Sequence, residues 1–274
     1  MNAPSFRSVS ARTVTADVLV VGGGAAGIRA ACSAAESGAS VLLVSDDPPA
    51  RGGSSFRNLS GGWGIQALVE EERTDAGLES FYRDVLRVGL GQADPGLVRI
   101  LVEESGPRIT DLMEWGVRFR RGEQGAFVRV AGCFSKAGRA FLTDSMENVQ
   151  EAFLSAIRRS SVKTLTGSAL QLLEADGACW GAWVVDPSGE LLRVTAPATI
   201  LAAGGGAGLF LRTLVSRTQV GAGCALALEA GATLRNMAFV QLMLTLEREG
   251  ELRFLPLQEL RGEFVGLFSL ILGM

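Results

Sequence analysis

The sequence predicts an α/β fold with a doubly wound parallel sheet and an inserted antiparallel meander. Three observations predict it. Short apolar runs typical of buried parallel strands stand at 17–21, 41–44 and 199–203. An alanine-rich stretch without proline at 25–37 separates the first two runs and predicts a helix. Between 170 and 194 apolar and polar residues alternate, which favours three antiparallel strands.

The first strand, helix and strand together take about thirty residues, the size of a βαβ unit. Gly38 is a suitable stop for the helix. A loop rich in glycine and serine follows at 48–64. Further elements are then expected in this order: helices at 80–88, 95–104, 107–115 and 141–159, a strand at 162–165, the meander with turns at 176–177 and 187–189, and a helix at 221–230.

Composition and charge exclude several classes of protein. Of 274 residues, 47% are hydrophobic and 20% are charged, as in a globular protein with a sizeable core. The net charge is −3 and no basic stripe appears, so nucleic-acid binding is not predicted. The first 16 residues lack the apolar stretch of a secretory signal, and no apolar run has the length of a membrane span.

Cysteine and histidine limit the chemistry further. The four cysteines lie far apart without a CxxC pair, which favours reduced thiols in a cytoplasmic protein: Cys32, Cys133, Cys179 and Cys224. Histidine is absent. Its absence excludes histidine metal ligands, nucleophiles activated by histidine, and a histidyl link to a cofactor. The sequence predicts no metal site.

A glycine loop, Gly22-x-Gly24-x-x-Gly27, stands between the first strand and its helix. Gly22 permits the tight turn, Gly24 lets a pyrophosphate approach the backbone, and Gly27 lets the helix pack on the sheet. Ala25 and Ala26 begin the helix, whose N–H groups face the phosphates. This context predicts a dinucleotide-binding Rossmann unit; the alternative is a glycine-rich turn without a ligand.

The second strand is expected to end near the ribose of the adenosine. Ser45 stands 23 positions after Gly22, close to the usual offset, so its hydroxyl is a candidate for the ribose. Asp46 and Asp47 are alternatives for this role or are solvated loop charges. Three glycines at 204–206 follow the later strand and form a second place where backbone can approach a long cofactor.

Three longer stretches point to one family. They are residues 17–45, residues 51–55 with Gly61 and Gly62, and residues 199–241; Arg261-Gly262-Glu263 is a shorter match. In these stretches the sequence resembles the flavoproteins fumarate reductase, succinate dehydrogenase and L-aspartate oxidase. The resemblance covers nearly the whole chain and about the first half of a typical family member.

The resemblance implies FAD bound in an extended form. Gly22, Gly24 and Gly27 would hold the pyrophosphate with Ala25 and Ala26, and Ser45 would serve the adenosine. The remaining contacts implied by the resemblance lie along the pyrophosphate and flavin (Ser54, Ser55, Gly61, Gly62), at the adenine (Ala169), and in a wall where Ala203 replaces a threonine (Ala203, Gly204, Gly205).

Departures from the family are as informative as the matches. Members with covalent flavin carry a histidine where this chain has Gly53, so non-covalent FAD is expected. An acid that helps to hold the cofactor is replaced by Ala222, and a substrate-binding histidine by Met243. Gln258 replaces a glutamate of the proton relay, while Arg261 is kept as the one matched catalytic residue.

The resemblance also implies a division of the chain. Residues 1–235 would form the FAD-binding domain, and residues 236–274 would begin a substrate-capping domain that is truncated here relative to the family. The apolar segment at 264–272 predicts a buried strand or helix, or an exposed surface that favours association.

Three hypotheses follow. The first is an FAD-dependent oxidoreductase of unknown substrate, completed by a partner chain or by a homo-oligomer. The second is a flavin-binding or scaffold protein without turnover, since most family catalytic residues are replaced or missing. The third, an NAD(P)-linked dehydrogenase, is disfavoured because the family match extends far beyond the glycine loop. We expect that the chain alone cannot reduce fumarate by the family mechanism.

Overall fold

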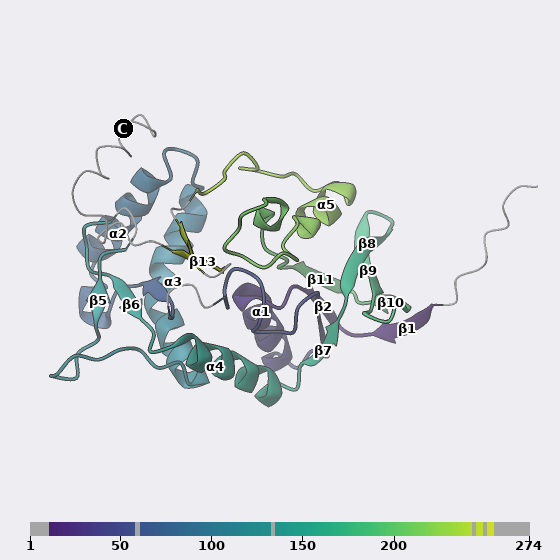
Figure 1. The fold of residues 1–274 in the computed structure, drawn as a ribbon, viewed down its shortest axis with the longest axis horizontal. Helices are drawn as coiled ribbons and strands as arrows, with labels where there is room; N and C mark the ends of the chain where they lie inside the picture. Colours follow the sequence, from purple (N-terminus) through teal and green to yellow (C-terminus); the bar gives the residue numbers. More distant parts are fainter. Residues whose placement is uncertain (1–10, 58–60, 133–134, 243–244, 249–250, 255–274) are drawn as a thin grey trace, which may run out of the picture.

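A four-stranded parallel sheet forms the centre of the molecule (Figure 1). The computed structural model describes residues 11–57, 61–132, 135–242, 245–248 and 251–254. The strands stand in the order β11 (Ala198–Leu201), β2 (Val18–Val21), β3 (Val41–Ser45) and β7 (Lys163–Thr166). Every neighbouring pair in this sheet is parallel. The predicted parallel sheet is therefore confirmed.

Both faces of this sheet are covered, which explains its uninterrupted apolar strands. Val20 and Leu43 point to the face that carries α1 (Ala25–Glu36) and α4 (Met146–Arg159). The alternate residues Leu19, Leu42 and Val44 point to the other face, into a second core shared with the meander. Because side chains alternate between the two faces of a strand, β2 and β3 contribute residues to both cores.

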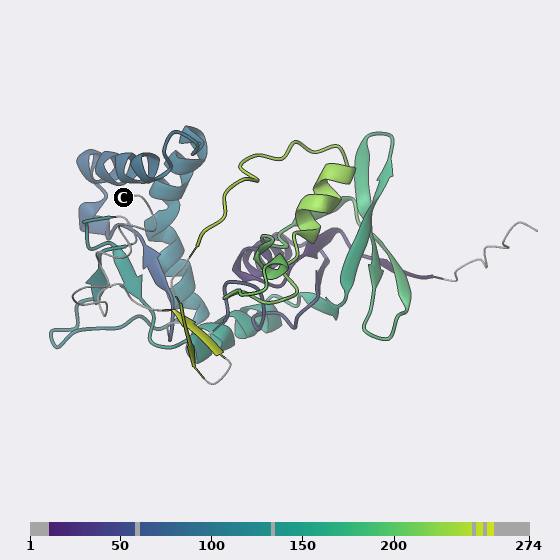
Figure 2. The ribbon, with the colours of Figure 1, turned by 45° about the horizontal axis from the view of Figure 1, so that its top comes forward.

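The antiparallel meander consists of β8 (Ser168–Ala175), β9 (Ala178–Val185) and β10 (Leu191–Thr195), as predicted. Figure 2 shows it as a layer at the side of the molecule. The fourth strand of this sheet was not foreseen: β1 (Arg12–Thr15) adds to the meander parallel to β10. These four residues lack a regular apolar pattern, so the sequence did not predict a strand here. They adopt the strand conformation because the edge of β10 is free to pair with them.

A separate group of elements packs beyond α1 and α4 (Figure 1). It contains η1 (Glu70–Glu72), α2 (Asp75–Val88), α3 (Pro95–Trp115) and a three-stranded antiparallel sheet, ordered β4 (Gly64–Gln66), β6 (Ala140–Leu142), β5 (Arg129–Val130). The α2 and α3 helices enclose a small core of their own, made by Leu68, Phe81, Val98 and Val102.

The prediction that a helix ends before Pro107 is wrong, because α3 runs through it. A proline lacks the N–H that would bind the carbonyl four residues earlier, here Glu103. Arg73 supplies the missing donor: its Nη1 binds the Glu103 carbonyl oxygen at 2.8 Å. A residue from outside the helix therefore compensates the proline, and no local pattern indicates this.

The predicted helix at 141–159 begins too early. Phe141 belongs to β6, and α4 begins only at Met146. Ser145 is its N-cap, with Oγ accepting from the Asn148 N–H at 3.2 Å. The expected strand at 162–165 is β7, and the expected helix at 221–230 is α5 (Ala222–Glu229).

After η2 (Ala207–Leu209) and α5 the chain returns toward the α2–α3 connection. Arg235 pairs with Asp94 at 3.5 Å, and Asn236 Nδ2 donates to the Gln92 carbonyl at 3.4 Å. A hairpin of β12 (Thr245–Arg248) and β13 (Glu251–Phe254) follows. Met243, Gln258, Arg261 and the apolar segment at 264–272 lie outside the described residues. Among the residues that are described, no helix is long and apolar enough to cross a membrane.

Candidate functional site

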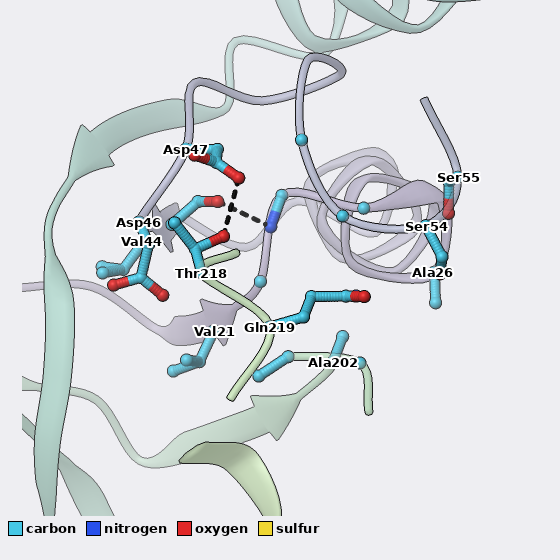
Figure 3. A pocket seen from close by; sticks show the side chains of 18 of the residues that line it. Val21, Ala26, Val44, Asp46, Asp47, Ser54, Ser55, Ala202, Thr218 and Gln219 are labelled. Atoms are coloured by element: carbon cyan, nitrogen blue, oxygen red, sulfur yellow. Dashed lines mark hydrogen bonds between the residues drawn. The ribbon is translucent and has the colours of Figure 1, made fainter. Parts of the chain in front are cut away.

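A cavity of about 250 Å³ lies at the carboxyl ends of β2, β3 and β11 (Figure 3). The chain leaves β2 through α1 toward β3 on one side, while β11 pairs with β2 on the other. Open parallel sheets bind ligands at such a switch point. The lining comes from the glycine loop (21–26), the end of β3 (44–48), the loop at 52–55, and the segments at Gly167, Ala169, 202–204 and 218–219.

The glycine loop is packed as a dinucleotide loop requires. Gly22 has φ +122°, and a Cβ there would lie 2.3 Å from the Ala202 carbonyl oxygen. A Cβ on Gly27 would lie 1.8 Å from the Gly22 carbonyl oxygen. A Cβ on Gly24 would meet only Ser55 Oγ, at 3.6 Å. The protein thus fills the space beside Gly22 and Gly27 and leaves the space above Gly24 to the cavity.

The N-terminus of α1 faces this cavity. Gly24 is the N-cap and offers no side-chain oxygen, and no acidic residue stands in the first turn. The Ala25 N–H donates to Ser55 Oγ at 3.3 Å, which brings the 52–55 loop over the helix end. Helix N-termini with N–H groups of this kind bind phosphates. The position fits the pyrophosphate of a dinucleotide.

The side chains at the end of β3 and directly after it form hydrogen bonds within the protein. Ser45 Oγ accepts from the Gly23 N–H at 3.0 Å and so braces the glycine loop. Asp46 Oδ1 accepts from the Ser168 hydroxyl. Asp47 Oδ2 accepts from Ser216 Oγ at 2.7 Å and from Thr218 Oγ1 at 2.8 Å. The Asp47 bonds join the loop after β3 to the segment before α5.

The structure gathers most of the predicted cofactor residues in one place. These residues line the cavity: Gly22, Gly24, Ala25, Ala26, Ser45, Ser54, Ser55, Ala169, Ala203 and Gly204. Four others do not line it: Gly27, Gly61, Gly62 and Gly205. Gly62 instead packs on Thr143, since a Cβ there would lie 2.6 Å from Thr143 Oγ1. The Gly205 carbonyl accepts from the Gly221 N–H at 3.1 Å.

Sequence reasoning missed two lining residues with polar side chains, Thr218 and Gln219. They belong to an irregular connection between η2 and α5, where no apolar period or motif marks them. Asp47, left open above, also lines the cavity. The lining includes two carboxylates, Asp46 and Asp47, and no lysine or arginine among the residues described. The described part of the lining therefore offers a phosphate only neutral donors.

This arrangement of parallel sheet, glycine loop and helix N-terminus defines a dinucleotide-binding α/β domain. Residues 17–263 match the family described as the FAD binding domain, and the chain belongs to that family. The cofactor of this family is FAD, so the cofactor predicted from the glycine loop and the resemblance is confirmed. The cavity fits it, because the open space above Gly24 meets the end of α1.

Curated relatives are of the predicted type. The chain is 27% identical over 204 residues to L-aspartate oxidase of Clostridium perfringens, covering 72% of this chain and 46% of the relative. It is 33% identical over 172 residues to a fumarate reductase (CoM/CoB) subunit from Methanothermobacter marburgensis, covering 58% and 30%. The chain therefore spans less than half the length of these relatives.

Solved structures agree. The open conformation of a flavocytochrome c3 fumarate reductase superposes with a TM-score of 0.76 at 25% identity, covering 91% of this chain and 45% of the other. A quinol-fumarate reductase with menaquinol superposes with a TM-score of 0.75 at 25% identity, covering 87% and 43%. The fold is that of the fumarate reductase type of FAD-binding domain.

Proposed function

We propose that this chain binds FAD non-covalently in an extended form and serves as the flavin unit of an oxidoreductase of unknown substrate. One observation carries the proposal: the cavity meets the α1 N-terminus at Gly24, which leaves room for a pyrophosphate where Gly22 and Gly27 do not. Bound FAD would supply the hydride acceptor or donor. The residues of this chain would bind the cofactor, orient it and exclude water from its phosphates.

Each part of the cofactor has candidate partners. The loop from Gly22 to Gly27 would hold the pyrophosphate, with Ser54 and Ser55 beside it. Ser45 and Ala169 would lie toward the adenosine. The wall of Ala203, Gly204 and Gly205 would flank the rest, with Gly61 and Gly62 toward the flavin. Gly205, Gly61 and Gly62 do not line the cavity itself.

Non-covalent attachment is supported by the residues that could form a link. The chain has no histidine. Its single tyrosine, Tyr82, lies on α2. The described cysteines Cys32, Cys179 and Cys224 do not line the cavity either. Position 53, where covalent members of the resembled family carry histidine, is a lining glycine.

Substrate chemistry would need groups beyond this cavity. The one matched catalytic candidate is Arg261, which lies outside the described residues. A further cation and a proton donor would complete the site, and a partner chain or a second copy is one source of them. The relative from Methanothermobacter marburgensis is a subunit of a fumarate reductase, which supports a partner chain. Location in the cytoplasm stays a prediction from the scattered cysteines.

We also propose the division into a FAD-binding domain (1–235) and the beginning of a substrate-capping domain (236–274). The β12–β13 hairpin supports it, because it forms a sheet of its own that pairs with no strand before residue 236 among the residues described. The contacts of Arg235 and Asn236 with the α2–α3 connection mark the crossing point.

A flavin-binding protein without turnover is the second candidate. It is favoured by three replacements relative to the resembled family: Ala222, Met243 and Gln258. In the structure Ala222 begins α5 with Gly221 as N-cap, and no side-chain cap or acid is present there.

The visible absorption spectrum of the purified chain tests the cofactor. We expect flavin bands and, after acid precipitation, FAD in the supernatant. A colourless protein that takes up no added FAD would contradict the proposal; flavin that stays in the pellet would contradict the non-covalent mode. Oxidation of a reduced dye by a panel of unsaturated acceptors then separates an enzyme from a binding protein.

A further inference from the structure

The Gln219 side chain reaches across the cofactor cavity from the segment before α5 (Figure 3). Its amide lies between two lining glycines on opposite walls. A Cβ on Gly204 would lie 2.2 Å from Gln219 Nε2, and a Cβ on Gly53 would lie 3.5 Å from the same atom. Gly204 therefore leaves room for this amide, which a side chain at position 204 would displace.

The backbone of Gln219 is fixed, whereas its amide is not engaged. The Gln219 N–H donates to the Ser216 carbonyl at 3.1 Å, and the Gln219 carbonyl accepts from the Gly208 N–H at 2.8 Å. For the side-chain amide, no hydrogen bond to another described residue is found. A half-buried amide with free donors and a free acceptor, aimed into a cavity, is suited to bind a polar ligand.

Hydrogen bonds hold the segment that carries Gln219 against the opposite wall of the cavity, and we call this set of bonds the clasp. Asp47 binds Ser216 and Thr218, and Arg57 Nη1 donates to the Val215 carbonyl at 2.6 Å. These bonds join the loops on both sides of the cavity mouth. Because the clasp orders residues 215–218 before a ligand arrives, the backbone of Gln219 is already in place, and only its side chain has to be ordered on binding.

Charge indicates which part of a dinucleotide this amide meets. A pyrophosphate is anionic, yet the described lining has no lysine or arginine and has two carboxylates. The Asp46 and Asp47 oxygens already accept from the hydroxyls of Ser168, Ser216 and Thr218. The described lining then offers a phosphate only neutral donors, and the Gln219 amide, beside Gly53 and Gly204, is one of them.

We propose that Gln219 is a binding residue for the pyrophosphate of the bound dinucleotide. The inference rests on the proposed FAD binding and adds a contact that neither the glycine loop nor the resemblance indicates. The amide would donate to a phosphate oxygen across the cavity from Gly24. The dinucleotide would then be bound between α1 and the segment at 215–219.

Calorimetric titration of the flavin-free chain with FAD and with ADP tests this role. Gln219→Leu keeps the size and removes the donor, so it should weaken both ligands about three- to tenfold. Gln219→Glu adds a negative charge and should weaken both about tenfold or more, with a loss that shrinks as salt is raised. Gln171→Glu, on the exposed meander, is the matched control and should bind both ligands as wild type does.

The outcomes separate the two proposals. If wild type binds FAD and both Gln219 variants bind it equally well, the inference is overturned and FAD binding stands. If the variants weaken FAD but not ADP, the amide contacts the flavin end and the pyrophosphate assignment is overturned. If wild type binds neither ligand, both proposals fall. If the flavin-free variants unfold at the same temperature as the wild-type chain, their fold is intact.

Discussion

Gly27 and Gly22 are in direct backbone contact: a Cβ on Gly27 would lie 1.8 Å from the Gly22 carbonyl oxygen. The contact holds α1 against the end of β2, and it sets the position of the helix N-terminus. Gly27 therefore supports the cofactor cavity without lining it.

Gly27→Ala should destabilise the chain by about 2–3 kcal/mol, because the added methyl group forces the helix away from the sheet. FAD binding should be lost along with the geometry of the loop. Urea unfolding and FAD titration measure the two effects. Gly122→Ala is the control, since the nearest atom to its Cβ would be the Ala126 carbonyl oxygen at 4.0 Å. An unfolding midpoint of Gly27→Ala equal to that of wild type would contradict the contact.

Asp47→Ala should open the clasp over the cavity. Ser216 and Thr218 then lose their shared acceptor, and the exposed Arg217 between them becomes a better site for trypsin. We expect cleavage after Arg217 to accelerate severalfold and FAD to dissociate faster. Asp46→Ala is the matched control, because Asp46 binds Ser168 on β8 and not the clasped segment. Equal cleavage rates in both variants would refute the clasp.

Asp84 and Arg139 should give a pH-dependent contribution to stability. Arg139 is buried and its Nη1 donates to Asp84 Oδ2 at 2.8 Å; this hydrogen bond lowers the pKa of Asp84 from 3.8, against the opposing effect of burial. A carboxyl with a lowered folded pKa stabilises the fold above its unfolded pKa. That stability is lost as pH falls below about 4 through the folded pKa.

Asp84→Asn should therefore cost about 1–3 kcal/mol at pH 7, and the difference from wild type should shrink below pH 4. Urea unfolding at pH 7, 5 and 3.5 measures it. Glu123→Gln, in an exposed turn, should change stability little at any of these pH values. A cost that stays constant down to pH 3.5 would rule out the ion pair as its source.

Arg73 and Pro107 should be coupled, although they do not bond each other. Arg73→Met removes the donor to the Glu103 carbonyl and should cost about 1 kcal/mol in the wild-type chain. In a Pro107→Ala background the alanine N–H can bind that carbonyl, so the cost of Arg73→Met should fall. A double-mutant cycle by urea unfolding measures the coupling. Additive effects of the two substitutions would show that Arg73 does not compensate the proline.

Local sequence patterns predicted the structure correctly where the conformation of a segment depends on its own residues. The β2–α1–β3 unit followed from apolar runs, an alanine-rich helix and the glycines between them. Predictions failed where a distant residue intervenes, as Arg73 does at Pro107. The helix expected from residue 141 failed for a similar reason, since Phe141 pairs with Arg129 and Ile65 in a sheet that no local signal marks.

The sequence by itself determined the cofactor loop, because only glycine tolerates φ +122° at position 22 and the contact at position 27. It also determined that this chain supplies no histidine. Only the tertiary structure decided that Asp47 meets Thr218, 171 positions later, and that Gln219 enters the cavity. Such pairings depend on how separate elements are placed by the two cores of the sheet, and side chains in an irregular connection leave no periodic trace of that placement.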